Sequence, residues 1–345
     1  MRTRLTTLAG EVGLEAGFLE DEEDCWVQIQ SDIAELPIHY ELDMVKFQNL
    51  YYSNADSFSE YYDLSLVVRH SNEAIAIWPI SVSRHADQWR IHSQESNIKA
   101  PLFRDSIGEK QRKRYYASCL ELLFKLRDSL NTDKLIFHQR LRSESLTDWH
   151  RKLMEKGARV LVRHDLYVNC NLSLEHINAK IRKSYKSLVN RGREDWYVEL
   201  HEEASSTLFD EFRNLHHEVS GRITRSQETW DHQLHLVNRN NGFLITLRDR
   251  QDERMIGASL FQYTPWEAMY AVAAYDRSLF HKGLGHVVQM EAIRELKKKG
   301  VKWYYIGQRP YPGDESTPGD KELSIAYFKE GFMTDMFVSM DIELC

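Results

Sequence analysis

The order of helices and strands along residues 171–345 constrains the fold more than any other feature of this sequence. Periodicity, glycine stops and polar turns predict the following elements there: helix 174–191, ending at Gly192; strand 197–201; helix 207–220, ending at Gly221; strands 243–248, 255–263 and 267–275; helix 286–299, ending at Gly300; strand 301–306; helix 321–330; and strand 333–343. The first two of the three consecutive strands flank a short polar turn, which predicts a hairpin. Helices combined with an antiparallel hairpin indicate an α+β unit.

Residues 1–170 show the same mixture of elements. The apolar runs 64–69 and 74–80 flank the polar turn His70–Glu73 and predict a second hairpin. Helix 115–130, strand 134–138, helix 149–156, which stops at Gly157, and the extended segment 158–169 follow. At about 150 residues per domain, the 345 residues suggest two domains, which repeat an order of elements without a visible sequence repeat.

Charge and cysteine usage narrow the class of protein. The net charge of −7 gives no reason to expect a polyanionic partner from composition alone. The four cysteines lie far apart without CxxC spacing, which predicts reduced thiols. They are Cys25, Cys119, Cys170 and Cys345. Glu11 and Glu15 interrupt any apolar leader, and no long window is both uncharged and apolar. We therefore expect a cytoplasmic protein without a signal peptide or a membrane span.

A basic segment covers residues 180–193. It contains no acidic residue and the following basic ones: Lys180, Arg182, Lys183, Lys186, Arg191 and Arg193. Such a helix face suits the phosphate of a nucleotide, a lipid-linked sugar or RNA. The alternative is a solvated face of a helix that packs through its apolar residues, because exposed aromatic residues typical of a nucleic-acid platform are not interleaved with the charges. Both interpretations remain open.

The helix 207–220 carries two adjacent histidines, His216 and His217. A histidine that titrates near neutral pH is able to take the proton of an attacking ammonium group, as aminolysis requires. Arg222 and Arg225, in the loop that follows, are suited to hold a carboxylate or a phosphate through paired hydrogen bonds. The alternative is a purely structural pair of histidines. No third ligand stands at metal spacing, so we expect no metal.

A Gly-x-Gly turn, Gly283 to Gly285, lies between strand 267–275 and helix 286–299. Glycines let backbone N–H groups approach a phosphate closely, and the beginning of a helix adds partial positive charge. A plain connecting loop is the alternative for so short a motif.

The order of these motifs resembles the FemAB-like branch of the GNAT superfamily of acyltransferases. Segment 181–192 resembles the helix that opens the second domain of such proteins, and Phe328-Lys-Glu-Gly-Phe332 is similar to the Phe-Lys-x-x-Phe-Gly segment that ends them. The similarity is clear over about residues 165–345 and architectural before that. It implies an α+β fold of two tandem GNAT-like (acyl-CoA N-acyltransferase) domains, 1–170 and 171–345, with mixed sheets flanked by helices and the active cleft in the second domain.

The resemblance also implies an activity. We expect an N-acyltransferase that moves an acyl group from acyl-CoA to an amine of a small or lipid-linked acceptor, such as an amino sugar or a cell-envelope polysaccharide precursor. Phe280 departs from the [Gln/Arg]-x-x-Gly-x-[Gly/Ala] pattern by which GNAT proteins bind coenzyme A. No helical hairpin of the kind found in some tRNA-using members is inserted. Aminoacyl-tRNA-dependent peptide-bond formation, and a GNAT-like fold that binds without catalysis, are the alternatives.

Residue chemistry and the resemblance together give candidate residues for each part of the reaction. The candidate catalytic residues are His217, His216 or Asp276 as base, and Tyr270 and Tyr275 as proton donors to the leaving thiolate. The candidate contacts with coenzyme A are Ala273 and Ala274 near the thioester carbonyl, and His281, Lys282, Gly283, Leu284, Gly285 and His286 around the pyrophosphate. The candidate contacts with the acceptor are Arg222, Arg225, Lys186, Gln308 and Lys321.

Overall fold

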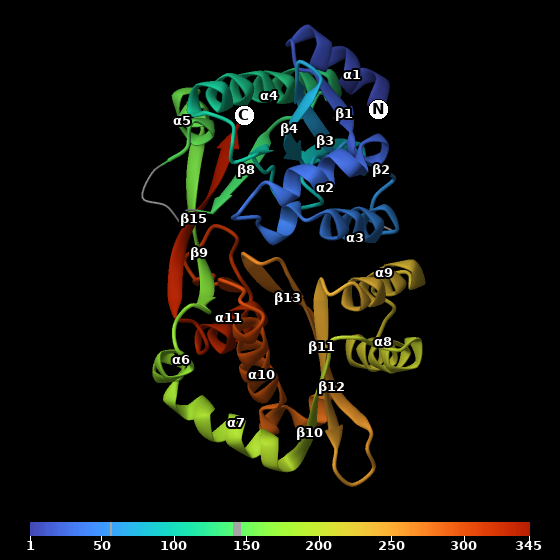
Figure 1. Ribbon diagram of the computed structural model, residues 1–345, viewed down its shortest axis with the longest axis vertical. Coiled ribbons are helices and arrows are strands. Elements are labelled where there is room, and N and C mark those ends of the chain that lie inside the picture. Colours follow the sequence, from blue (N-terminus) through green and yellow to red (C-terminus); the bar gives the residue numbers. More distant parts are fainter. Residues whose placement is uncertain (56, 141–145) are drawn as a thin grey trace. The chain divides into compact units, whose positions relative to one another are not determined.

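The computed structural model describes residues 1–55, 57–140 and 146–345, and the chain divides into two compact units (Figure 1). Unit 1 comprises residues 1–163 and 338–345, and unit 2 comprises residues 164–337. The expected boundary near residue 170 differs from this division mainly at the C-terminus, where the last eight residues group with unit 1. The reason is that β15 (Asp335–Leu344) pairs with β8 (Leu135–Arg140) and buries Ile342 in the core of unit 1.

Unit 1 is built from short antiparallel strands covered by helices. Its helices are α1 (Arg2–Glu11), α2 (Glu23–Ser31), α3 (Leu42–Ser53), α4 (Glu109–Leu130) and α5 (Asp148–Glu155), with 3-10 turns at Leu19–Asp21 and Ile38–Tyr40. Its strands, besides β8 and β15, are β1 (Ala16–Phe18), β2 (Glu60–Asp63), β3 (Leu66–His70), β4 (Glu73–Trp78), β5 (Ser81–His85), β6 (Gln88–His92) and β7 (Leu102–Phe103). The strands form the sheets β1-β3-β4-β7 and β2-β5-β6. The expected hairpin is confirmed as β3 and β4.

Alternation along β4 explains why helices lie on both faces of the larger sheet in unit 1. Ile75 belongs to the apolar cluster that contains α4, whereas Ile77 belongs to the cluster that contains Trp26 of α2. Successive side chains of a strand point to opposite faces, so an apolar run without polar interruptions has both faces buried.

None of the four cysteines of the chain forms a disulfide, and Cys119 is buried in α4.

Unit 2 is a mixed sheet with helices on both faces. Its helices are α6 (Leu174–Lys180), α7 (Lys183–Asp195), α8 (Ser206–Ser220), α9 (Gln227–Asn238), α10 (Leu284–Lys298) and α11 (Asp320–Glu330), with a 3-10 turn, η3, at Arg277–Lys282. Its strands, in sheet order, are β10 (Trp196–His201), β11 (Gly242–Asp249), β12 (Met255–Tyr263), β13 (Glu267–Tyr275), β14 (Trp303–Gln308) and β9 (Arg159–Asn169). The expected α+β architecture is confirmed.

The helices of unit 2 divide between the two faces of its sheet (Figure 1). Helices α7 and α10 pack on the face that carries Ile245 and Phe261, and α8 and α9 pack on the face that carries Leu244 and Leu260.

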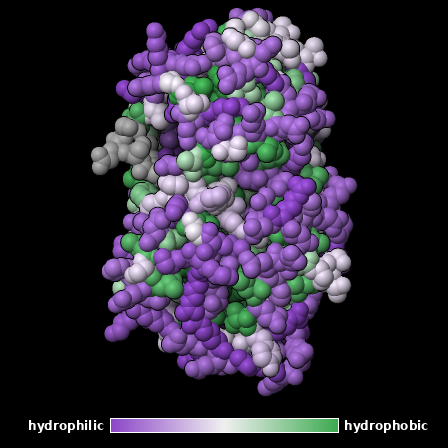
Figure 2. Space-filling view, in the orientation of Figure 1, coloured by the Kyte–Doolittle hydropathy of each residue, from purple (hydrophilic) through white to green (hydrophobic). Residues whose placement is uncertain are grey.

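None of the helices in the described part of the chain combines the length and the apolar character that a membrane span requires. The face shown in Figure 2 is largely hydrophilic, with small hydrophobic areas between the charged ones.

One expected helix is divided and differs from the prediction in its end. The segment 174–191 forms two helices, α6 and α7, which are interrupted at Ile181 and Arg182, where the backbone N–H of Arg182 donates to the carbonyl of Gly331. Gly192 does not end the helix but lies buried inside α7, which continues to Asp195. A β-carbon on Gly192 would lie 2.9 Å from two side-chain atoms of Val287, so the glycine permits α7 to contact α10 closely.

This contact leads to a first prediction, which compares two Gly→Ala replacements inside helices. At Gly10 in α1 there is no atom within 4 Å of an added β-carbon. Gly10→Ala should therefore raise the free energy of unfolding by up to about 1 kcal/mol through helix propensity. Gly192→Ala should lower it by about 1–3 kcal/mol, because Val287 is fully buried and has little room to move. Thermal or urea denaturation of both variants measures the difference, and a stabilised Gly192→Ala would show that the helices separate at no cost.

Candidate functional site

The centre of unit 2 contains two neighbouring strands that separate. β13 and β14 run parallel and pair only through Glu267–Met269 and Trp303–Tyr305. Each strand has an irregularity just beyond this segment, at Ala271 opposite β12 and at Ile306 opposite β9. Such bulges bend a strand and increase its twist. We call the residues beyond the pairing, Tyr270–Tyr275 and Ile306–Gln308, the β13–β14 fork.

Lys329 of α11 lies over this fork. Gly307 has a φ of 145°, and a β-carbon there would lie 2.7 Å from Lys329 Nζ, so only glycine lets β14 pass so close to the ammonium group. On the other side, Lys329 Nζ is 5.9 Å from the centre of the Tyr270 ring. In the described part of the chain the ammonium group has no hydrogen-bond or ion-pair partner. Burial lowers the pKa of Lys329.

Two tyrosines of β13 extend the polar lining of the fork. The hydroxyl groups of Tyr270 and Tyr275 are 3.2 Å apart, and the Tyr275 hydroxyl is 2.7 Å from Ser259 Oγ. Burial raises the pKa of both phenols, so they stay protonated and able to donate hydrogen bonds at neutral pH. The structure thus brings Tyr270 and Tyr275 together, and Lys329 joins them. Lys329 belongs to the Phe328–Phe332 motif, which by itself assigns it no role.

The Gly-x-Gly turn leads directly into α10, as expected. Gly283 has a φ of 68° and precedes the first helical residue, Leu284, so the free N–H groups of α10 begin at this turn. A β-carbon on Gly285 would touch the Phe328 ring at 3.1 Å. His286 packs its ring 4.3 Å from that of Tyr185 and its Nδ1 lies 3.1 Å from the carbonyl of Gly283. Burial lowers the pKa of His286, which makes it a neutral packing residue at this position.

The other candidates around the turn have different surroundings. His281 is exposed and Lys282 is half-buried, while Phe280, at the position of the missing Gln or Arg, is 59% exposed. Asp276 accepts hydrogen bonds from the backbone and hydroxyl of Ser278 and pairs with Arg254 at 3.0 Å. These contacts lower the pKa of Asp276, and a carboxylate held in this way is a weak base. Ala274 is buried on the α8 side of β13, and Ala273 is half-buried.

A second cluster lies where α8 ends and α9 begins, and we call it the α8–α9 corner. It consists of His216, His217, Arg225, Trp230 and Gln233. The Trp230 ring is central: it lies 5.2 Å from the His216 ring, 6.3 Å from the His217 ring and 4.9 Å below the Arg225 guanidinium. Arg225 Nη1 donates to Gln233 Oε1 at 3.1 Å. The structure therefore brings three of the candidate residues, His216, His217 and Arg225, into one group.

Several buried polar atoms of the α8–α9 corner and of the adjacent Thr224 lack a hydrogen-bond partner among the described residues. They are His216 Nδ1, His217 Nε2, Thr224 Oγ1, Trp230 Nε1 and Gln233 Nε2. Buried polar atoms are normally satisfied, so a group of unsatisfied atoms indicates a place for water or a polar ligand. Burial, helped by Arg225, lowers the pKa of His216 to about 4. Burial, helped by Arg213 and Arg225, also lowers the pKa of His217, so both rings are neutral at pH 7.

The two clusters are separated, because the α8–α9 corner packs on one face of the sheet and Tyr270 and Tyr275 pack on the other, with α10. Gln308 is exposed at the end of β14 and belongs to the fork. The remaining candidates are exposed elsewhere: Lys186 on α7, Arg222 beyond α8 and Lys321 at the start of α11. No group of three or more His, Cys, Asp or Glu in the described ranges is arranged to hold a metal ion.

Comparison with known proteins relates part of unit 2 to a family. Residues 176–317 match the model of the acetyltransferase (GNAT) domain. This match supports acyltransferase activity for the domain in unit 2. The fold of the chain is similar to the crystal structure of FemX, with a TM-score of 0.65, 8% identity, and 95% of this chain and 96% of that chain covered. No curated protein matches the chain significantly.

Two further solved structures support the same fold. The structure of L-PGS from Bacillus licheniformis has a TM-score of 0.59 and 12% identity, and covers 92% of this chain and 90% of that one. A tandem GNAT protein from the clavulanic acid biosynthesis pathway has a TM-score of 0.51 and 11% identity, and covers 96% and 98%. At these identities the similarity concerns the fold alone. The expectation of two tandem GNAT-like domains is confirmed.

Proposed function

We propose that this GNAT acyltransferase transfers an aminoacyl group from tRNA to the amine of an acceptor that carries a carboxylate or a phosphate. The observation that carries the proposal is the unpaired, half-buried Lys329 ammonium above the β13–β14 fork. When an amine attacks an ester, negative charge develops on the carbonyl oxygen, and a preorganised cation in a partly dry site stabilises that charge strongly. The Tyr270 hydroxyl is a further donor beside the same position.

The basic face of α7 supports tRNA as the donor. Lys183, Lys186 and Arg191 are exposed on this helix, and none forms an ion pair with another described residue. The face adjoins the turn before α10, because Leu188 of α7 lies 3.3 Å from the position of a β-carbon on Gly283. Exposed cations next to the donor turn favour a long polyanion, and the exposed Phe280 ring offers a surface on which a base can stack. The fold is also similar to that of the C-terminal domain of a putative lysylphosphatidylglycerol synthetase, at 13% identity, and the name of that protein agrees with aminoacyl transfer.

The acceptor amine needs a base and an anchor, and the α8–α9 corner offers both on the face of the sheet opposite Tyr270 and Tyr275. The proposal therefore requires the amine to reach the ester between β13 and β14, where the two strands separate. A neutral imidazole with an unsatisfied nitrogen, His217 Nε2, is suited to take the proton of the ammonium group. Arg225, stacked on Trp230, is suited to hold the carboxylate or phosphate of the acceptor. In the reaction, the C–N bond forms, the ester C–O bond breaks, and the leaving ribose hydroxyl takes up a proton. An amino sugar or a cell-envelope precursor meets these requirements for an acceptor.

Acyl-CoA is the second candidate for the donor, and the Gly283–Gly285 turn at the start of α10 favours it. The two donors share phosphate chemistry but differ in the length of the polyanion. Coenzyme A engages a single turn, whereas tRNA engages an extended basic surface.

Salt-dependent binding separates the two donors and provides a second prediction. For deacylated tRNA we expect log Kd to rise steeply with log salt, because each phosphate contact contributes about 0.7–0.9 to the slope. Lys183→Gln/Lys186→Gln should lower the slope by about 1–2, whereas Arg239→Gln/Lys302→Gln, which removes two exposed cations elsewhere in unit 2, should leave it unchanged. Binding of coenzyme A without binding of tRNA would make acyl-CoA the proposed donor. If neither coenzyme A nor tRNA binds, both proposed donors are contradicted.

A further inference from the structure

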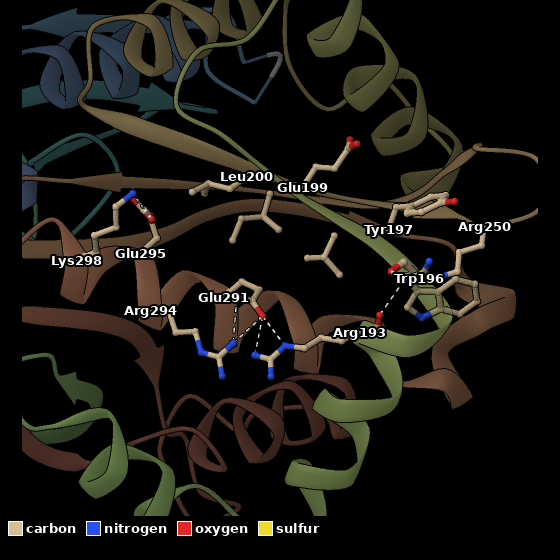
Figure 3. Close-up of a pocket in the computed structure, with 12 residues that line it drawn as sticks. Arg193, Trp196, Tyr197, Glu199, Leu200, Arg250, Glu291, Arg294, Glu295 and Lys298 are labelled. Carbon is tan, nitrogen blue, oxygen red and sulfur yellow. Dashed lines mark hydrogen bonds and ion pairs between the residues drawn. The ribbon is translucent and has the colours of Figure 1, made fainter.

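A cavity in unit 2 lies apart from the β13–β14 fork and from the α8–α9 corner. It has a volume of about 580 Å³ and opens between the edge strand β10 and the outer side of α10 (Figure 3). This volume is within the range of about 300–1,000 Å³ that is typical of small-molecule sites. Its inner wall is apolar and is formed by Trp196, Val198, Leu200 and Ile245. Leu200 is 40% exposed, so this apolar wall is accessible from solvent.

The rim of the cavity carries more positive charge than its carboxylates neutralise. Arg193 Nε donates to Glu291 Oε1 at 2.8 Å, and Arg294 Nη1 donates to the same oxygen at 3.2 Å, so two guanidinium groups share one carboxylate (Figure 3). Arg193 Nη2 lies 2.7 Å from that oxygen but without hydrogen-bond geometry. Two cations beside one anion leave a positive charge at this place for a second anion.

One of the other carboxylates at the rim is compensated and the second only in part. Glu295 lies 3.4 Å from Lys298 Nζ and 3.7 Å from Lys299 Nζ. Glu199 lies 3.6 Å from Arg248, which pairs more closely with Glu211, at 2.6 Å. Glu295 therefore repels an anion that binds between Arg193 and Arg294 less strongly than a free carboxylate would.

A buried donor in the wall completes the site. Trp196 is 7% exposed and lines the cavity, and its Nε1 has no hydrogen-bond partner among the described residues. Its indole N–H is a donor only, so it calls for an acceptor atom of a ligand or of water. Arg250 lies 4.6 Å from the Tyr197 ring and donates to the backbone carbonyls of Arg193 and Trp196, which fixes the end of α7 against the first residue of β10.

We propose that this β10–α10 cavity binds an organic anion with an apolar body. The body lies against Val198, Leu200 and Ile245, and the carboxylate or phosphate head lies between Arg193 and Arg294. The Trp196 N–H donates to an oxygen of the ligand. The site is independent of the proposed transfer reaction, because none of its residues belongs to the fork or to the corner.

Binding of defined probes tests this proposal with the intact protein. The fluorescent anion 8-anilinonaphthalene-1-sulfonate is titrated first, and octanoate, octyl phosphate and 1-octanol are then used as competitors. We expect saturable binding that octanoate or octyl phosphate displaces at least tenfold more effectively than 1-octanol, which has the same chain and no charge. The more effective of the two anions identifies the head group as a carboxylate or a phosphate. Equal displacement by 1-octanol, or no saturable binding, would overturn the proposal.

Variants place the probe in the cavity. Arg193→Gln/Arg294→Gln should weaken binding of the probe and of the better competitor at least tenfold, whereas Arg239→Gln, an exposed cation elsewhere in unit 2, should not change it. Val198→Trp should weaken binding by filling the cavity without altering its charge. The Tm of each variant confirms folding, and Val198→Trp provides an independent result if loss of both arginines unfolds unit 2. Unchanged affinity in both folded variants would show that the probe binds elsewhere.

Discussion

Replacing Lys329 by methionine is expected to lower kcat by about 10²–10³ with a small change in KM. The ammonium group is unpaired, it lies over the point where β13 and β14 separate, and Gly307 leaves room for it. An interaction that forms only when charge develops on the carbonyl oxygen lowers the barrier without tightening substrate binding. Steady-state kinetics with the donor that binds in the salt titration measures the effect.

Two further variants separate the role of the charge from that of the side chain. Lys302→Met removes an exposed lysine from the same unit and should leave kcat unchanged. Lys329→Arg keeps the charge, but its larger head must fit beside Gly307, so we expect partial activity. Equal kcat values for the wild-type protein and Lys329→Met would exclude the lysine from the reaction.

The pH dependence of Lys329→Arg gives a sharper test. Burial lowers the pKa of Lys329 below its ordinary value, so its positive charge is present below the lowered pKa and is lost as the pH rises through it. The rate should therefore fall on the alkaline side earlier than an ordinary lysine would allow. Arginine stays charged throughout this range, so the alkaline fall should move upward in Lys329→Arg. An unchanged alkaline limb would mean that another group titrates there.

The sequence pattern predicts most elements of unit 2 because its signals are local. The hairpin of β11 and β12 follows from two apolar runs around a polar turn, and the ends of α8 and α10 follow from Gly221 and Gly300. The interruption between α6 and α7 does not follow in this way, because it depends on a bond from Arg182 to Gly331, far away in the sequence. Helix α9 was not predicted, since its buried side includes the polar Thr229 and Gln233.

The sequence predicts the histidines and the glycine turn of the candidate site, but it does not predict a role for Lys329. His216, His217 and Arg225 meet because two consecutive helices place them around Trp230. Lys329 acquires its surroundings only when α11 packs over β14, a contact that no local pattern reports. The sequence contains both Lys329 and Gly307, but only the structure shows that the two residues lie against each other.

Replacing His217 by alanine is expected to lower kcat/KM by about 10²–10⁴, which is the usual contribution of a general base. His217 Nε2 is unsatisfied, and burial and two arginines lower the pKa of the ring, so the basic form is present at neutral pH. His216→Ala removes the other candidate base, on the same helix and beside the same aromatic group, and should lower kcat/KM less than His217→Ala. Arg225→Gln should raise KM for the acceptor and leave the effect of His217 on kcat intact.

The acid limb of the pH–rate profile distinguishes the two histidines. A base with a lowered pKa is active above that pKa and loses activity as the pH falls through it, so the rate controlled by either ring should persist below pH 6.5, the ordinary value for histidine. A limb centred near pH 4 would assign the base to His216, whose pKa is about 4. A limb below pH 6.5 that disappears in His217→Ala but not in His216→Ala would assign it to His217. If the limb stays unchanged in both variants, neither histidine accepts the proton, and the α8–α9 corner serves to hold the acceptor alone.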